Sequence, residues 1–182
     1  MTEEEIRAAN VGSPAVLDGP VQLAEYDPAW PELFAREAER ITGALGGTVV
    51  EVWHVGSTSV PGLAAKPVID ILVVLADSGD EEAYVPALEA AGYRLRIREP
   101  AWYEHRLFKG PDTDVNLHVL TRGCPEIERM VRFRDRLRTH PEDRAHYEAA
   151  KRELAARTWR HVQNYADAKT AVVEAILARA GA

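Results

Sequence analysis

The chain has 182 residues, of which 46% are hydrophobic, and its 22 basic and 29 acidic residues give a net charge of −7. This length suits one hydrophobic core, and the acidic balance argues against an extended nucleic-acid surface. Cys124 is the single cysteine, which excludes intrachain disulfides and cysteine clusters that bind metals and fits a reducing cytoplasm. No apolar run approaches the ~20 residues that span a membrane, and the acidic N-terminus lacks the features of a secretion signal, so we expect a soluble cytoplasmic protein.

The pattern along the chain predicts an arm followed by one domain. Residues 1–19 are acidic and then broken by glycine and proline, so we expect a flexible arm. Residues 20–182 are expected to form a single domain. The predicted elements of its first half are, in chain order, a short strand at 21–25, a helix from Asp27 to the Gly46-Gly47 pair, strands at 49–55 and 68–75, and a helix at 80–91.

The second half of the domain continues with strands and ends in helices. The pattern predicts a strand at 93–98, a hairpin of 104–109 with 114–120, and helices at 126–138, 141–157 and 162–180. In the last strand, a period of two places Asp114, Asn116 and His118 on one face. The alternating arginines of 132–138 are interpreted mostly as a solvated helix surface. This order of elements indicates the α+β class.

A short run of small and hydroxyl-bearing residues, Gly56-Ser57-Thr58-Ser59, directly follows the strand at 49–55. A glycine lets the backbone approach a ligand closely, and hydroxyls and amides donate hydrogen bonds to phosphate oxygens. The run therefore predicts a phosphate-binding turn. The alternative is a tight connection from strand to loop with no ligand.

Asp70 lies inside the apolar run 68–75. An ionised carboxylate at such a position is costly unless a cation or hydrogen-bond donors stabilise it. We therefore predict that Asp70 binds a divalent ion. The alternative is a structural ion pair with Lys66 or an arginine.

Residues 54–71, which contain the turn and Asp70, resemble the hallmark segment of the GrpB family, a domain that is sometimes fused to dephospho-CoA kinase. Further similar segments are 26–30, 104–108, 116–119, 133–138, and Tyr165 with Lys169. The resemblance covers about residues 21 to 180. It implies the nucleotidyltransferase superfold, with a mixed β-sheet, a leading helix, a crossover helix and a C-terminal helical layer.

The resemblance also implies a site. In the superfold the Gly-Ser turn holds a triphosphate, and two carboxylates at positions i and i+2 of the next strand bind divalent ions. Asp70 matches the first carboxylate, but Leu72 stands at the second position and cannot bind a metal. We therefore expect one Mg²⁺ on Asp70, completed by phosphate oxygens and water, in place of a two-metal site. His118 matches the family motif and is expected to act as a base or to orient the acceptor.

The remaining candidates fall into a binding group, a second base and a supporting group. The residues expected to bind nucleotide or phosphate are Gly56, Ser57, Thr58, Ser59, Lys66, His105, Arg106, Tyr165 and Lys169. Glu104 is the second candidate base. The residues expected to support the site are His54, Asn116 and Asp114. Each has a plain structural alternative: a solvated strand end, a core histidine, or a lysine at the edge of an apolar helix face.

These residues predict a transferase that uses ATP or another nucleoside triphosphate with Mg²⁺. It would move a nucleotidyl or phosphoryl group to a hydroxyl of a small molecule, and the phosphoryl variant would be a small-molecule or antibiotic-type kinase. The alternative function is a non-catalytic nucleotide- or metabolite-binding module that has lost the two-metal site, and Leu72 is the argument for it. A third possibility, suggested by the family's fusions, is a scaffold or partner domain.

Overall fold

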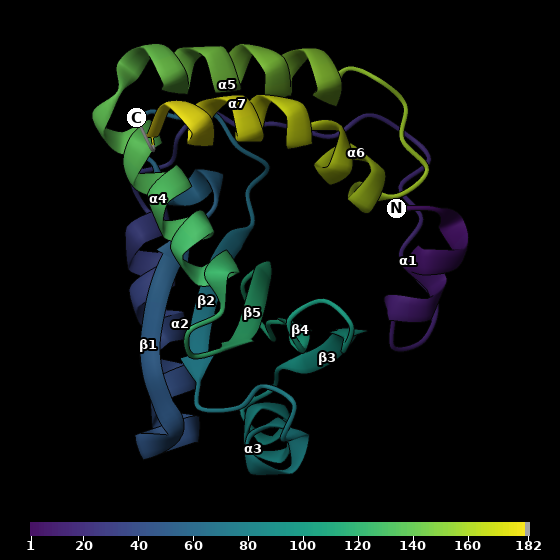
Figure 1. The fold of residues 1–182 in the computed structure, drawn as a ribbon, viewed down its shortest axis with the longest axis vertical. Coiled ribbons are helices and arrows are strands. Elements are labelled where there is room, and N and C mark those ends of the chain that lie inside the picture. Colours follow the sequence, from purple (N-terminus) through teal and green to yellow (C-terminus); the bar gives the residue numbers. More distant parts are fainter. Residues whose placement is uncertain (181–182) are drawn as a thin grey trace.

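The computed structural model describes residues 1–180, and it is built on one five-stranded sheet (Figure 1). The strands are β1 (Val49–Val55), β2 (Ile69–Leu75), β3 (Arg94–Glu99), β4 (His105–Lys109) and β5 (Val115–Thr121). Their order across the sheet is β1-β2-β5-β4-β3. The β2 and β5 strands run parallel, and the other neighbours are antiparallel. This mixed sheet, combined with helices, confirms the predicted α+β class.

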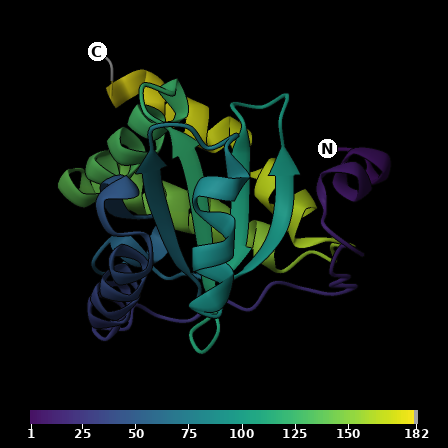
Figure 2. The ribbon, with the colours of Figure 1, turned by 90° about the horizontal axis from the view of Figure 1, so that it is seen from below.

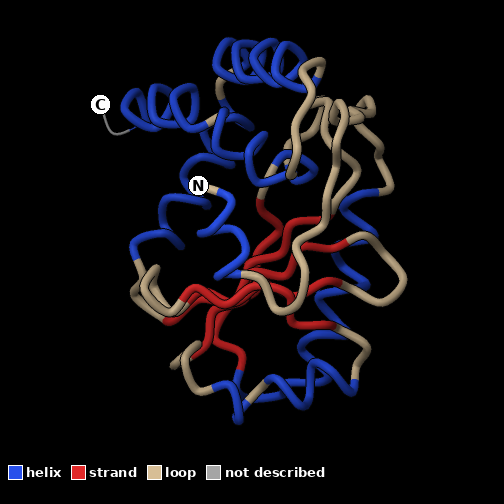
Figure 3. Tube along the Cα trace, turned by 90° about the vertical axis from the view of Figure 1, so that its right-hand side faces the viewer, coloured by secondary structure: helices blue, strands red, loops and turns tan. Residues whose placement is uncertain are grey.

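Helices cover both faces of the sheet (Figures 2 and 3). The side chains of β2 alternate between the two faces. Ile69, Ile71 and Val73 pack against α2 (Trp30–Leu45) and α3 (Val85–Ala90) in the main core. On the other face, Leu72 packs in a smaller apolar cluster that includes side chains of α4 (Pro125–Thr139). Asp70 shares this second face, so the α4 side of the sheet carries the predicted site.

A helical layer closes the α4 side of the molecule. After α4 come α5 (Pro141–Ala155), α6 (Val162–Ala168) and α7 (Thr170–Ala180), and α5 and α7 lie side by side in Figure 1. Side chains of α4, α5 and α7 form a core cluster with Val60 and Leu63, which follow the Gly-Ser turn. The C-terminal helical layer is therefore present, and it packs directly on the turn. The single helix predicted at 162–180 is wrong, because the chain breaks it at Lys169, the C-terminal cap of α6.

The first residues differ from the stretch without regular structure that the sequence predicted. A helix, α1 (Glu3–Ala9), begins at a Thr2 capping box and buries Ile6. The amide of Val11 then donates to the carbonyl of Arg96 in β3, with an N–O distance of 2.7 Å. The mobility of this arm stays a prediction. The predicted strand at 21–25 is reduced to an isolated bridge between Ala24 and Ala65.

Other boundaries move by a few residues. The helix predicted from Asp27 begins at Trp30, although the Asp27 carboxylate still accepts from the amide of Ala29 at 2.8 Å. The helix predicted at 80–91 is a short 3-10 turn followed by α3. Among residues 1–180, no helix has the length and apolar character needed to cross a membrane.

Candidate functional site

The Gly-Ser turn lies directly against Asp70. Gly56 ends β1 with φ 67 and ψ −172, a region that is open only to glycine. A Cβ atom built on Gly56 would lie 2.3 Å from Oδ2 of Asp70. The glycine is therefore required twice, by its backbone angles and by the closeness of the carboxylate.

The three hydroxyls of the turn are not equivalent. The Thr58 hydroxyl donates to the carbonyl of Val68 at 3.1 Å, and the Ser59 hydroxyl donates to the carbonyl of Gly56 at 2.5 Å. Both side chains are buried, so these hydroxyls hold the turn together instead of facing a ligand. Ser57 is only half buried, and its hydroxyl accepts a hydrogen bond from Nζ of Lys151 at 3.1 Å. Of the three, Ser57 is the one placed to meet a phosphate.

His54 supports the turn from the sheet side. Its ring stacks on Phe34, with centroids 4.7 Å apart, and its Nε2 lies 3.1 Å from the Thr58 hydroxyl. Burial lowers the pKa of His54 to about 4, and Arg138 and Arg134 add to this effect against the opposing charge of Asp70. The imidazole is therefore neutral at pH 7. Because the Thr58 hydroxyl gives its proton to Val68, Nε2 of His54 is the donor.

Two arginines of α4 fasten the backbone of the turn. Nη1 of Arg134 donates to the carbonyl of His54 at 3.1 Å. Nε and Nη2 of Arg138 both donate to the carbonyl of Ser59, at 2.9 and 2.7 Å. The interpretation of the arginines of 132–138 as mostly solvated surface is therefore wrong for the buried Arg134, whereas Arg138 is exposed and still binds the turn. Their guanidinium groups satisfy buried carbonyls and hold α4 against the turn.

Asp70 is the acidic centre of the site. Its Oδ1 accepts from Nδ2 of Asn116 at 2.8 Å and lies 3.7 Å from Nε2 of His118. Burial acts to raise the pKa of Asp70, but neighbouring His118, the Asn116 hydrogen bond and the charge of Lys169 together lower it. The carboxylate is therefore ionised at neutral pH and available to a cation.

Asn116 is itself oriented by a second set of contacts. Nζ of Lys109 donates to Oδ1 of Asn116 at 2.9 Å and to Oδ1 of Asp114 at 2.8 Å. Because Lys109 can only donate, it fixes the amide oxygen of Asn116 on its side and turns the amide nitrogen to Asp70. Asn116 and Asp114 thus stand where a supporting role for Asp70 requires them.

His118 belongs to a row of polar side chains on the same face. Its Nδ1 lies 3.1 Å from Nε2 of His105, and Nδ1 of His105 lies 2.7 Å from Oε2 of Glu99. His105 is buried, and its ring also meets the edge of Trp102 with centroids 5.2 Å apart. Burial lowers the pKa of His105, although Glu99 opposes the effect. His105 therefore contacts His118 and not open solvent.

The chain contains four lysines, Lys66, Lys109, Lys151 and Lys169, and all of them gather around Asp70 and Ser57. Burial lowers the pKa of Lys66, and the charges of Lys109 and Lys169 lower it further against Asp114 and Asp70. The remaining basic residues of the chain are arginines. A compact ammonium therefore occurs in this protein only where it faces the turn and Asp70, and the excess of positive charge suits an anion with several charges.

Lys151 is the functional candidate that the sequence reasoning missed. Its side chain is 2% exposed, its Nζ donates to the Ser57 hydroxyl and to the carbonyl of Ala64, and it lies 4.9 Å from the ring centroid of Tyr147. Burial lowers its pKa to about 7, and Lys169 contributes in the same direction. Helical spacing could have found it, because Tyr147 and Ala155, at i−4 and i+4, are buried apolar-face positions.

Tyr165 and Lys169 meet at the end of α6. Nζ of Lys169 lies 4.6 Å from the ring centroid of Tyr165, and the tyrosine is 4% exposed. Among the described residues the Tyr165 hydroxyl has no hydrogen-bond partner. Burial raises its pKa to about 12, so it keeps its proton and remains a donor. An orphaned donor beside a lysine is consistent with an anionic ligand.

Two predicted site residues are not brought to this cluster. Arg106 and His105 are adjacent in β4 and so point to opposite faces of the sheet; Arg106 lies on the far face and pairs with Glu81 at 2.6 Å. Glu104 lies beyond the other end of β2, where it lines a 500 Å³ pocket with Asp77. Neither residue can share a ligand with the Gly-Ser turn, because the sheet and the length of β2 separate them.

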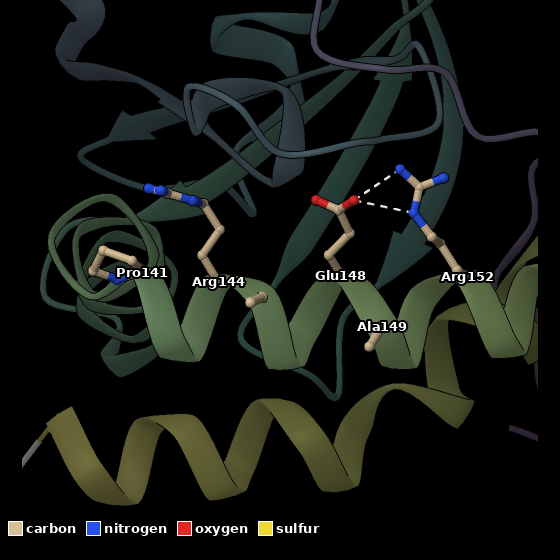
Figure 4. A pocket seen from close by; sticks show the side chains of 6 residues that line it. Pro141, Arg144, Glu148, Ala149 and Arg152 are labelled. Carbon is tan, nitrogen blue, oxygen red and sulfur yellow. Dashed lines mark hydrogen bonds and ion pairs between the residues drawn. The ribbon is translucent and has the colours of Figure 1, made fainter.

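A shallow groove of 370 Å³ lies along the outer side of α5 (Figure 4). Arg152 spans it by pairing with Glu148, at 2.8 Å, and with Glu25, at 2.7 Å. Arg144 also lines the groove and donates to the carbonyl of Leu137 at 3.4 Å, and the lining contains none of the four lysines. The groove is a surface feature of the helical layer.

The donors at Asp70 fit a divalent ion that needs few protein ligands. Oδ2 faces Gly56, Oδ1 faces His118, and Leu72 is fully buried and offers no donor. Within residues 1–180 no three His, Cys, Asp or Glu side chains are placed to hold a metal together. Water and phosphate oxygens would have to complete the coordination, as they usually do for Mg²⁺.

These features define a mixed α+β domain in which the Gly-Ser turn, a strand carboxylate and the lysines lie together. The chain belongs to the GrpB family: the family model described as "GrpB protein" matches residues 20–179. A UPF0157 protein of Halalkalibacterium halodurans is 58% identical over 181 residues, which covers 100% of this chain and 93% of that protein. The predicted family is therefore confirmed.

A solved structure and a longer protein agree with this membership. The crystal structure of conserved protein GrpB from Enterococcus faecalis has a TM-score of 0.73 at 30% identity, over 87% of this chain and 96% of that one. A dephospho-CoA kinase of Mycolicibacterium paratuberculosis is 30% identical over 89% of this chain but only 46% of its own length. The Cid1 poly(U) polymerase also shows a likeness, with a TM-score of 0.46 at 11% identity over 71% of this chain and 45% of that one.

Proposed function

We propose that this protein binds the polyphosphate of ATP or another nucleoside triphosphate at the Gly-Ser turn. The observation that carries this proposal is the gathering of all four lysines around Ser57 and Asp70 in a chain of net charge −7. Such a local excess of positive charge lacks enough carboxylates to balance it. A polyphosphate, with several negative charges and many acceptor oxygens, supplies what is missing.

The same geometry supports transfer of a phosphorus-containing group to a hydroxyl of a small molecule. Ser57 and Lys151 hold the phosphates, and Lys66 and Lys169 balance the charge that grows during transfer. The acceptor oxygen bonds to phosphorus as the bond from phosphorus to the leaving group breaks. The leaving group is the nucleoside diphosphate in phosphoryl transfer and pyrophosphate in nucleotidyl transfer. His118 takes the acceptor's proton at Nε2. Asp70 would hold a divalent ion, with Mg²⁺ as the ion expected from the sequence, and this ion would neutralise charge at the phosphates.

A second function, binding without catalysis, is favoured by one observation. Leu72 is fully buried in the apolar cluster beneath α4, so the position of a second carboxylate is filled by packing. A module of this kind would bind the nucleotide on the same lysines. It would release the nucleotide unchanged.

Calorimetry with ATP, with and without divalent ions, tests the binding proposal. We expect ATP to bind the full chain, and Lys151→Met to weaken binding at least tenfold. The matched control is Arg132→Met, which removes an exposed positive charge elsewhere on the surface. The absence of ATP binding to the native chain under every condition would contradict both functions.

Mass spectrometry of a panel of hydroxyl-bearing acceptors then separates transfer from binding. A gain of one phosphate indicates phosphoryl transfer, and a gain of a nucleotide indicates nucleotidyl transfer. Product that disappears in Asp70→Asn supports catalysis. Tight ATP binding with no product over the whole panel favours the binding module.

A further inference from the structure

Asp70 and His118 offer a metal ion one carboxylate and one imidazole, where the superfold offers two carboxylates. The parallel register sets Asp70 beside Asn116 and Leu72 beside His118, so Asp70 and His118 are diagonal neighbours on one face. Oδ1 of Asp70 and Nε2 of His118 are 3.7 Å apart, too far for a hydrogen bond. Their side chains are 26% and 21% exposed, so both atoms can meet a ligand.

The contacts among Glu99, His105 and His118 indicate which nitrogen of neutral His118 carries the proton. The Glu99 carboxylate accepts a hydrogen bond, so Nδ1 of the buried His105 carries a proton. In neutral His105 the other nitrogen, Nε2, is then an acceptor, and Nδ1 of His118 must donate to it across 3.1 Å. In the neutral form of His118 this tautomer leaves the lone pair of Nε2 on the side of Asp70. A ligating histidine in proteins is usually held in this manner, with its second nitrogen donating to an acceptor.

The spacing of the two atoms suits one metal ion. Ligand atoms about 2.0–2.2 Å from an ion lie about 3.0–3.5 Å apart for octahedral to tetrahedral angles. The observed 3.7 Å is reached from these values by a shift of a few tenths of an ångström. The imidazole of His118 thus supplies, from the neighbouring strand, a donor that Leu72 cannot.

We propose that Asp70 and His118 together form a mixed carboxylate–imidazole site that selects a first-row transition ion, such as Mn²⁺ or Co²⁺, over Mg²⁺. This deepens the proposed function, on which it rests for the place of the ion, and it replaces the role of His118 as base, because an Nε2 atom that binds a metal cannot accept a proton. The acceptor's proton then passes to water. Mg²⁺ prefers oxygen ligands only, whereas Mn²⁺, Co²⁺ and Zn²⁺ accept an imidazole nitrogen. Glu99 and His105 are positioning residues, since they contact His118 and not the ion.

Metal binding without nucleotide tests the inference on the full chain. Titration with Mn²⁺, followed by the electron paramagnetic resonance of free Mn²⁺, gives its affinity, and calorimetry gives that of Mg²⁺. We expect Mn²⁺ to bind at least tenfold more tightly than Mg²⁺. His118→Gln should lower Mn²⁺ affinity at least tenfold and change Mg²⁺ affinity little, and Asp70→Asn should abolish both. His146→Gln is the matched control, because His146 is exposed on α5.

A second readout tests the positioning residues. With Co²⁺ bound, the ligated imidazole should give a hyperfine-shifted N–H proton signal that is absent in His118→Gln. Glu99→Leu removes the acceptor and should lower Mn²⁺ affinity about tenfold. Glu99→Gln keeps an acceptor oxygen and should lose less. A purely structural role would make the losses follow the melting temperatures of the variants instead.

The two proposals fail in different ways. Equal affinity for Mn²⁺ and Mg²⁺, unchanged Mn²⁺ affinity in His118→Gln, or no metal binding by the native chain would each overturn the mixed site. ATP binding that depends on Lys151 would survive any of these results. Loss of that ATP binding would instead overturn the proposed function, whichever metal the protein prefers.

Discussion

Two groups of charged side chains lie on opposite faces of the same sheet, and they are built differently. On the α3 face, Arg98 and Arg106 both donate to the carboxylate of Glu81, at 2.6 to 2.7 Å. These hydrogen bonds lower the pKa of Glu81 to about 2 despite partial burial, and the bond from Arg98 has the larger effect. On the α4 face, four lysines gather around Asp70, and of these Lys109 pairs with Asp114 at 2.8 Å, so the lysines outnumber these two carboxylates.

The difference separates charges that hold the fold from charges that await a ligand. The planar guanidinium groups of Arg98 and Arg106 match a carboxylate in a fixed geometry, which suits a permanent pair. The ammonium of Lys151 instead bonds one hydroxyl and one carbonyl, and neither carries a full charge. Balanced charges indicate structure, and an unbalanced buried cation indicates a binding site.

The largest effect is expected at the point where the α4 face is tightest. Gly56→Ala places a Cβ 2.3 Å from Oδ2 of Asp70 and forces alanine into backbone angles that only glycine tolerates. We expect a loss of about 4 kcal/mol in the free energy of unfolding, from strain and overpacking together. Urea denaturation measures it, and any folded fraction should bind no metal at Asp70.

Gly62→Ala is the control for this change. Gly62 has φ +77, but a Cβ there would meet nothing within 4 Å. Its cost should therefore be only the backbone part, about 1–2 kcal/mol. Equal losses at the two glycines would show that contact with Asp70 plays no part.

Arg106→Met tests the balanced face. The arginine side chain is 6% exposed, and its loss leaves Glu81 with Arg98 alone. We expect a loss of about 2 kcal/mol in the free energy of unfolding, because one partner of a largely buried pair is removed and the other keeps a second arginine. ATP affinity should not change, since Arg106 lies on the other side of the sheet. A tenfold loss of ATP affinity with stability intact would place Arg106 in the site after all.

The sequence predicted most of the fold and the centre of the site. The strands, the leading helix, the helical layer, the Gly-Ser turn and its neighbour Asp70 follow from periodicity, turn residues and a motif. The sequence did not predict that the hydroxyls of Thr58 and Ser59 would donate to backbone carbonyls, because this depends on which carbonyls tertiary packing brings within reach. Local patterns carry no such information.

The faces of β4 were predictable and were overlooked. Adjacent strand residues point to opposite sides, so His105 and Arg106 could not both reach one ligand. Local patterns could not predict the contact between Lys151 and Ser57, because the two residues are 94 positions apart along the chain. The rarity of lysine among the 22 basic residues was the signal present in the sequence.

Lys151→Met is expected to separate binding from stability. Replacing a buried amine of low pKa by an apolar side chain of similar length should leave the free energy of unfolding unchanged or raise it. ATP affinity should fall about tenfold, or about 1.4 kcal/mol, through the lost phosphate contact. Thermal melts and calorimetry on the same preparation measure both. A large loss of stability would show that Lys151, like Arg106, mainly stabilises the fold.

The smallest effect is a change in bound protons. The pKa of Lys151 is about 7 in the folded chain, against 10.5 for an ordinary lysine. At pH 8 about nine-tenths of the free protein therefore carries a neutral amine at this position. A polyphosphate favours the charged form and raises the pKa, so binding should take up close to one proton at pH 8 and almost none at pH 6.

Calorimetry of ATP binding in buffers of different ionisation enthalpy counts these protons, and Lys151→Met should abolish the uptake at pH 8. The lowered pKa of Lys151 also makes the free energy of unfolding depend on pH. The unfolded chain binds the extra proton between pH 7 and 10.5, so stability of the native chain should rise with pH across that window relative to Lys151→Met. Proton uptake that persists in the variant would show that another group takes up the proton.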